Sequence, residues 1–154
     1  MRTMLLSFKP EVYNRILSGE KIFEHRRTFP NEPIKAYMYV SSPVCAITGI
    51  LFLGKRHNLN EWKERFSYDV AAVARIEAYL QKVNYAMEIL EFRETTSISL
   101  NKLREDIGDF VCPQMYYYLE GKPLLKYLEE NLICQERIVR HSFDTIVPET
   151  ICRH

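Results

Sequence analysis

The sequence predicts a single α+β domain built on a mostly antiparallel, barrel-like sheet with flanking helices. Strand-like apolar runs fill most of the first 55 residues and return at 84–94, and a helix-periodic stretch lies between them. No internal repeat, low-complexity tract or Gly/Ser linker divides the 154 residues, so we treat 1–154 as one domain. A chain of this length buries roughly two thirds of its unfolded surface, which is enough for one core.

The N-terminal part predicts a strand followed by a short helix. Met4–Ser7 is an apolar run that ends at Lys9 and Pro10. Proline suits the first turn of a helix, and apolar residues recur at helical spacing over Pro10–Ser18. Gly19 follows where a helix C-cap is expected.

Three further strands are predicted in the first 55 residues. Ile22–Arg27 alternates, which places Glu24 and Arg26 on the same face as Ile22. Ala36–Val40 is rich in tyrosine and valine and stops at Ser41-Ser42-Pro43. Ala46–Leu53 is another apolar run, in which Gly49 marks a bend and Gly54 an end.

The pattern becomes helical at 57–82, which we interpret as a helical insertion. Asn60 and Asp69 are suited to cap its two helices. The next elements are a strand within 84–94 and a helix over Ser99–Asp106.

The C-terminal third predicts one more strand and one more helix. Gln114–Leu119 carries three tyrosines and follows a turn-rich piece, and Pro123–Glu130 has inward-facing leucines at helical spacing. Residues 133–154 form either an edge strand or a partly ordered C-terminal arm.

Charge and composition restrict the class of partner. The net charge is only +1, but residues 1–56 carry nine Lys or Arg against four acids, an excess of +5 that leaves −4 for the rest. This asymmetry is compatible with a basic surface on one side of the fold. We see no signal peptide and no apolar run long enough for a membrane span, so we expect a cytoplasmic protein without a membrane partner.

The cysteines and histidines show no metal-binding spacing. Cys45, Cys112, Cys134 and Cys152 are widely separated, a pattern that favours reduced free thiols. The four histidines form neither HxxxH nor HExxH. We therefore expect no metal and no cofactor, and the absence of G-x-S-x-G and P-loop motifs argues against a serine hydrolase or a nucleotide triphosphatase.

The segment ILSGEKIFEHRR is the richest candidate site. Gly19 permits a tight turn, after which Lys21, Glu24 and Arg26 place donors and a carboxylate close together. Lys21 and Arg26 suit a phosphate or carbonyl oxygen, and Glu24 suits a base edge. The alternative is an ordinary surface ion pair between Glu24 and Arg26. Lys9 and Arg27 are further candidate contacts to phosphate.

Two other groups are candidate contacts. The hydroxyls of Ser41 and Ser42, at the end of a strand, suit an anion, although turn chemistry explains them equally well. Gln114 suits a base edge and Tyr116 suits stacking on a base, although at least one of the three consecutive tyrosines belongs to the core.

These segments resemble the ASCH domain of the PUA-like superfamily. LLSFKPEVYNRILSGEKIFEHRR followed by IKAYMYVSSPVCAITGILFLG is similar to its strand, helix, G-x-K and E-x-R strand, and SLNKLREDIGDFVCPQMYYYL is similar to a later part. The resemblance is strong over residues 4–55 and looser over 84–120. It implies a PUA-like β-barrel with flanking helices and a cleft that binds RNA.

The resemblance also implies enzymatic alternatives. Some small members are amidohydrolases that deacetylate N4-acetylcytidine, and a ribonuclease activity has been attributed to the family. Lys21 matches the catalytic lysine of the amidohydrolases, whereas their threonine three positions later is Glu24 here.

Three functions therefore stand as expectations. The first is a module that binds RNA or a nucleoside or nucleotide. The second is an enzyme that uses Lys21 and Glu24 on an acylated nucleoside. The third is a regulatory domain whose protein partner is unknown.

Overall fold

A curved seven-stranded sheet organises the structure, a computed structural model that describes residues 1–154. The strands are β1 (Arg2–Phe8), β2 (Phe23–Arg26), β3 (Ile34–Val40), β4 (Ala46–Asn58), β5 (Tyr85–Ser99), β6 (Tyr116–Tyr118) and β7 (Cys134–Arg140). The helices are α1 (Pro10–Leu17), α2 (Leu59–Arg65), α3 (Val70–Leu80), α4 (Leu100–Asp106) and α5 (Pro123–Asn131), with a 3-10 turn at Pro148–Thr150.

The sheet is mixed but mostly antiparallel, as the sequence predicts. Its strand order is β2-β5-β4-β3-β1-β6, and only β1 and β3 are parallel. β2 pairs with Tyr85–Glu88 of β5 and β7 with the later part of β5, so both follow the same edge of that long strand. The sheet curls into a half-barrel with helices packed on it, which confirms the predicted α+β class and the mostly antiparallel sheet.

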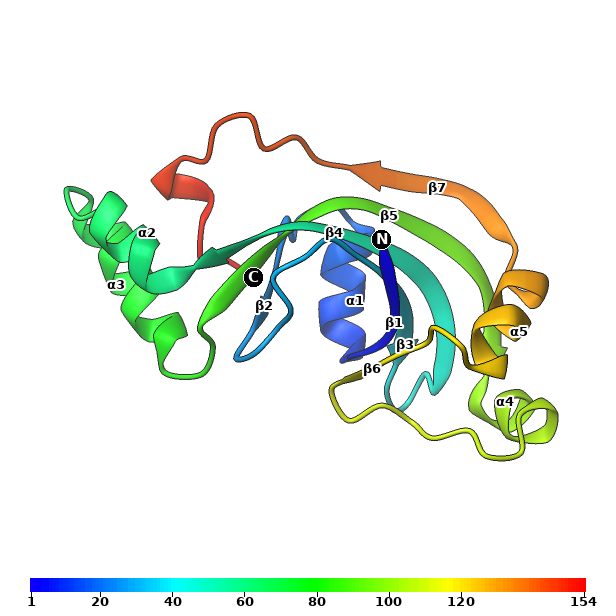
Figure 1. Cartoon of the computed structure of the whole chain (residues 1–154). Coiled ribbons are helices and arrows are strands. Elements are labelled where there is room, and N and C mark those ends of the chain that lie inside the picture. Colours follow the sequence, from blue (N-terminus) through cyan, green and yellow to red (C-terminus); the bar gives the residue numbers. More distant parts are fainter.

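Helices cover the sheet in three places (Figure 1). α1 lies under the arch and packs Tyr13 and Ile16 against inward residues such as Met38 and Phe92. α4 and α5 gather at one end and pack on the opposite face. α2 and α3 gather at the other end, where Trp62 of α2 packs with Phe23 of β2 and with the C-terminal segment.

Local signals explain most helix starts. The side chains of Asp69 and Ser99 accept hydrogen bonds from the amides of Ala72 (3.0 Å) and Lys102 (3.2 Å), which caps α3 and α4. The predicted cap of α2 at Asn60 is wrong by two residues. Asn58 is the cap instead, and its side chain accepts from the Asn60 amide at 2.9 Å.

Two strands are longer than the sequence predicts. β4 continues through Gly54 to Asn58, because its last residues still pair with the start of β5. β5 continues past Glu94 to Ser99 for the same reason. The C-terminal region forms the predicted edge strand at β7, and its last residues return toward β2.

No helix combines the length and the apolar character that crossing a membrane would require.

Candidate functional site

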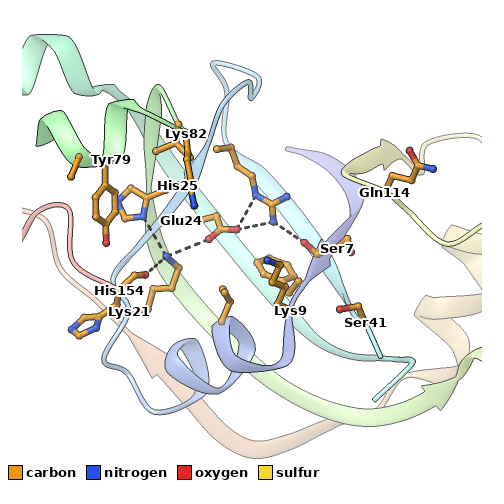
Figure 2. Close-up of a pocket in the computed structure, with 15 residues that line it drawn as sticks. Ser7, Lys9, Lys21, Glu24, His25, Ser41, Tyr79, Lys82, Gln114 and His154 are labelled. Carbon is orange, nitrogen blue, oxygen red and sulfur yellow. Dashed lines mark hydrogen bonds and ion pairs between the residues drawn. The ribbon is translucent and has the colours of Figure 1, made fainter. Parts of the chain in front are cut away.

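A pocket of about 750 Å³ lies where β1, β2, α3 and the C-terminal segment meet (Figure 2). Six of the ten residues predicted from the sequence line it, drawn from four separate parts of the chain: Lys9, Lys21, Glu24, Arg26, Ser41 and Gln114. Six further polar or aromatic residues line it that were not predicted: Ser7, Phe8, His25, Tyr79, Lys82 and His154.

The turn after α1 delivers Lys21 to the pocket. Gly19 ends the helix with φ +84°, a conformation that costs glycine little. The Lys21 amide then donates to the Arg15 carbonyl at 3.0 Å, which fixes the turn before β2 begins. The Lys21 side chain ends up 4% exposed.

Glu24 joins the two cations of the pocket floor. Its Oε2 accepts from both Nε (2.9 Å) and Nη2 (2.7 Å) of Arg26, and its Oε1 lies 3.5 Å from Lys21 Nζ. Arg26 Nη2 also donates to the Ser7 carbonyl at 2.8 Å. Glu24 and Lys21 are almost fully buried, so this is a desolvated network and not the exposed ion pair of the alternative interpretation.

All three N–H donors of the Lys21 ammonium have an acceptor nearby. Besides Glu24, these are the His154 main-chain oxygen at 2.6 Å and His25 Nδ1 at 3.3 Å (Figure 2). Burial lowers the pKa of Lys21, and the carboxylate of Glu24 opposes that effect. The Lys21 amine therefore lies between three acceptors: the Glu24 carboxylate, His25 Nδ1 and the His154 main-chain oxygen.

His25 is neutral and has one unused donor. Because an ammonium only donates, Nδ1 accepts from Lys21 and the ring proton lies on Nε2, a buried atom with no hydrogen-bond partner. Burial and the adjacent Lys21 lower the pKa of His25 to about 3. The edge of its ring packs against Tyr79, with ring centroids 4.8 Å apart.

The rim of the pocket is cationic. Lys9 and Lys82 are exposed and form no ion pair. With Lys21, Arg26 and the single side-chain carboxylate of Glu24, the side chains of the lining carry a formal excess of +3 when the histidines are neutral. Apolar and aromatic side chains provide the remaining wall, namely Phe8, Val12, Tyr79 and Val83.

Four predicted contacts lie outside this pocket. Arg27 follows the last residue of β2 and is exposed, and Ser42 is exposed in the turn after β3. Tyr116 packs instead between Phe29 and Tyr118, with centroids 5.7 and 6.0 Å away. Gly19 does not line the pocket; its positive φ allows the turn that places Lys21 there.

The residues missed from the sequence come mostly from distant segments. Tyr79 and Lys82 belong to the end of α3, and His154 to the last residues, so no local pattern connects them to Lys21. His25 lies inside the charged segment, and its position four residues after Lys21 was the available signal.

No group of three or more His, Cys, Asp or Glu side chains is arranged to hold a metal ion.

Comparison with known proteins gives the fold but no sequence relative. No protein-family model matches the chain, and no curated protein matches it. Three solved structures share its fold, all of ASCH from Zymomonas mobilis. The structure titled as ASCH itself has a TM-score of 0.64 and 20% identity over 86% of this chain and 96% of that one.

Two mutants of the same protein give similar values. A serine-to-alanine mutant has a TM-score of 0.63 and 21% identity, over 84% of this chain and 96% of that one. A tyrosine-to-phenylalanine mutant has a TM-score of 0.62 and 19% identity, over 88% of this chain and all of that one. The resemblance noted in the sequence is thus confirmed at the level of structure: this chain has the ASCH fold.

Proposed function

We propose that the chain binds RNA or a nucleotide in the pocket around Lys21, Glu24 and Arg26. The observation that carries the proposal is the combination of a +3 lining with an aromatic and apolar wall in one cavity of about 750 Å³. Nucleotides present an anionic phosphate and a flat base, and such a cavity offers a complement to each. The ASCH fold agrees with this proposal but does not carry it.

The distribution of charge points to binding of a short segment. The whole chain has a net charge of +1, which gives no reason to expect a broad basic face. The two exposed, unpaired lysines of the rim, Lys9 and Lys82, are the groups best placed to meet phosphate. Arg26 Nη1, which has no acceptor in the structure, adds a donor at the floor.

Fluorescence anisotropy with a pool of short labelled single-stranded RNAs at low salt tests this proposal. We expect binding by the wild-type chain and a several-fold loss of affinity in Lys9→Ala and in Lys82→Ala. Lys126→Ala is the matched control, because Lys126 is an exposed lysine of α5 that does not line the pocket. No binding to any RNA, or equal losses in all three variants, would reject the proposal.

Hydrolysis of an acylated nucleoside is the second candidate function. The observation that favours it is Lys21, whose pKa is lowered by burial and which could polarise a carbonyl or act as a nucleophile. Glu24 would act through Oε1, since two N–H groups of Arg26 occupy Oε2. Incubation with acylated nucleosides followed by mass spectrometry tests it, and activity that survives both Lys21→Ala and Glu24→Ala would remove these residues from the mechanism.

A further inference from the structure

Two of the four cysteines converge on the hydroxyl of Tyr39. The Cys112 thiol donates to Tyr39 Oη at 3.5 Å. Cys45 ends the turn between β3 and β4, next to the pair that Tyr39 forms with Ile47. Burial raises the pKa of Tyr39, and the thiols of Cys112 and Cys45 beside its hydroxyl raise it further. Because both sulfur atoms lie beside the same oxygen, the two thiols are close neighbours although 67 positions separate them in the sequence.

These two thiols are accessible to a small oxidant, whereas Cys152 is not. Cys45 and Cys112 are half-buried. Cys152 is 2% exposed, and burial raises the pKa of its thiol to about 12, which suppresses the reactive thiolate. Cys134 is exposed at the start of β7. An oxidant in solution can therefore reach three thiols, of which Cys45 and Cys112 share Tyr39 as a neighbour.

Backbone contacts on both sides keep the two thiols in place. The Cys45 carbonyl accepts from the Leu100 amide at 2.9 Å. On the other side, the Val111 carbonyl accepts from Tyr117 Oη at 2.7 Å, so the residue before Cys112 is also held. The sulfur atoms of a disulfide lie only about 2 Å apart. Rotation of the two cysteine side chains, with a small approach of their backbones, is what a bond between them requires.

Such a bond would join two segments that line the candidate pocket. Ser41 begins the turn that ends at Cys45, and its carbonyl accepts from the Cys45 amide at 3.5 Å. Gln114 follows Cys112 by two residues. Ser41 and Gln114 both line the pocket, on the side away from Tyr79 (Figure 2). Drawing Cys45 and Cys112 together therefore draws together the two segments that form this side.

We propose that Cys45 and Cys112 are a peroxide-sensitive pair whose disulfide narrows the Ser41–Gln114 side of the pocket. One thiolate attacks hydrogen peroxide and breaks the O–O bond, which gives a sulfenic acid and, after protonation, one water. The second thiol attacks that sulfur, the S–O bond breaks, and a second water leaves as the S–S bond forms. The two thiols lose two electrons and two protons, and the peroxide is reduced to two waters.

Peptide mapping of the full chain tests the bridge. The reduced protein is treated with hydrogen peroxide, its remaining thiols are blocked, and it is digested without reductant for mass spectrometry. We expect a Cys45–Cys112 peptide pair within one chain, lighter by two hydrogens, and an unmodified Cys152. Cys134→Ser is the matched control and should give the same bridge. Separate oxidation of Cys45 and Cys112, or bridges of either one to Cys134, would overturn the pairing.

Single variants test whether each thiol resolves the other. In Cys45→Ser and Cys112→Ser the sulfenic acid formed on the remaining thiol has no partner to attack it. We expect a sulfenic-acid reagent such as dimedone to trap several-fold more product in at least one of these variants than in the wild type. Equal trapping in the wild type and both variants would contradict a resolving pair.

The effect on the pocket rests on the proposed function and is measured separately. We expect the oxidised wild type to bind the labelled RNA pool several-fold more weakly than the reduced protein, and Cys45→Ser to show no such difference. Amide hydrogen exchange over residues 107–115 should slow on oxidation in the wild type alone, which gives a readout without ligand. Equal RNA affinities and unchanged exchange would overturn the narrowing. If neither form binds RNA, the proposed function fails, whereas the mapped bridge is unaffected.

Discussion

At the scale of single residues, Glu24 is the most consequential charge of the candidate site. It is the only side-chain carboxylate that pairs with the buried Lys21 and the largely buried Arg26. Glu24→Gln keeps its shape but leaves two buried cations without a counter-charge. We expect the free energy of unfolding, measured by urea denaturation, to fall by about 3 kcal/mol.

Glu91 offers a matched control for that substitution. It also pairs with two arginines, Arg93 and Arg140, but their side chains are 40% and 69% exposed. Because water screens those charges, Glu91→Gln should cost under about 1 kcal/mol. Equal losses in the two variants would mean that burial of the Lys21–Glu24–Arg26 network has no energetic consequence.

His25 should make stability depend on pH. Its folded pKa of about 3 lies well below the ordinary value of 6.5, so the unfolded chain binds this proton more readily than the folded chain does. The stability that neutral His25 contributes is complete above pH 6.5 and is lost as the pH falls toward 3. The slope that one such group produces reaches at most about 1.4 kcal/mol per pH unit.

Urea denaturation of the wild type and of His25→Gln between pH 6.5 and 5 isolates this effect. Most carboxylates remain ionised over that interval. His141, whose pKa burial also lowers, contributes to both proteins alike. We expect the variant to lose less stability than the wild type on acidification, and parallel curves would contradict the assignment of His25 as a buried neutral ring.

The sequence predicted the charged residues of the site, but not the contacts that His25 and His154 make with Lys21. Alternation along the strand correctly places Glu24 and Arg26 together, because β-strand geometry is local. The same alternation assigned His25 to the opposite face, yet it lines the pocket because Lys21 reaches it from the turn before the strand. The contact from His154 joins residues 133 positions apart, a separation at which no local rule operates.

At the scale of elements, β4 contains a glycine that the packing of the sheet requires. A Cβ at Gly49 would lie 2.9 Å from the Phe92 ring and 3.2 Å from Met38 Sδ, both buried under α1. We expect Gly49→Ala to lower the free energy of unfolding by about 1–3 kcal/mol, because the core cannot widen without moving these side chains.

Gly54→Ala in the same strand is the natural comparison. Its Cβ would meet only the Leu90 side chain, which is 37% exposed and free to turn away. We expect a change under about 1 kcal/mol. A Gly54→Ala loss as large as that of Gly49→Ala would show that strand conformation matters more here than the core contact.

The ends of β4 and β5 could not be predicted from local sequence patterns. Gly54 looked like the end of a strand, since glycine is depleted in strands. The strand continues because Arg56, His57 and Asn58 find partners in β5. Hydrogen bonds to a strand almost 30 residues away decide where these elements end. The cap at Asp69 depends on local sequence alone and was predicted correctly.

At the scale of the whole molecule, the fold brings a pocket together from segments that share no pattern. Lys9, Lys21 and Arg26 come from the basic N-terminal third, and Lys82 from the end of α3. The basic excess of residues 1–56 therefore indicated three of the four cations of the pocket, but not that the fold brings them together with Lys82. Family resemblance anticipated the half-barrel, because fold is retained at an identity of about 20% to the solved ASCH structures.

The salt dependence of RNA affinity distinguishes this pocket from a broad nucleic-acid surface. Only Lys9 and Lys82 are exposed, unpaired cations of the pocket, so we expect about two phosphate contacts. For single strands that number gives a slope of log affinity against log salt of about −1.4. Anisotropy titrations at several salt concentrations measure it. The double variant Lys9→Ala/Lys82→Ala should have a slope near zero, and Lys126→Ala that of the wild type. A slope of about −4 or steeper would require some six contacts, more than the pocket provides, and would move the binding site to another face of the molecule.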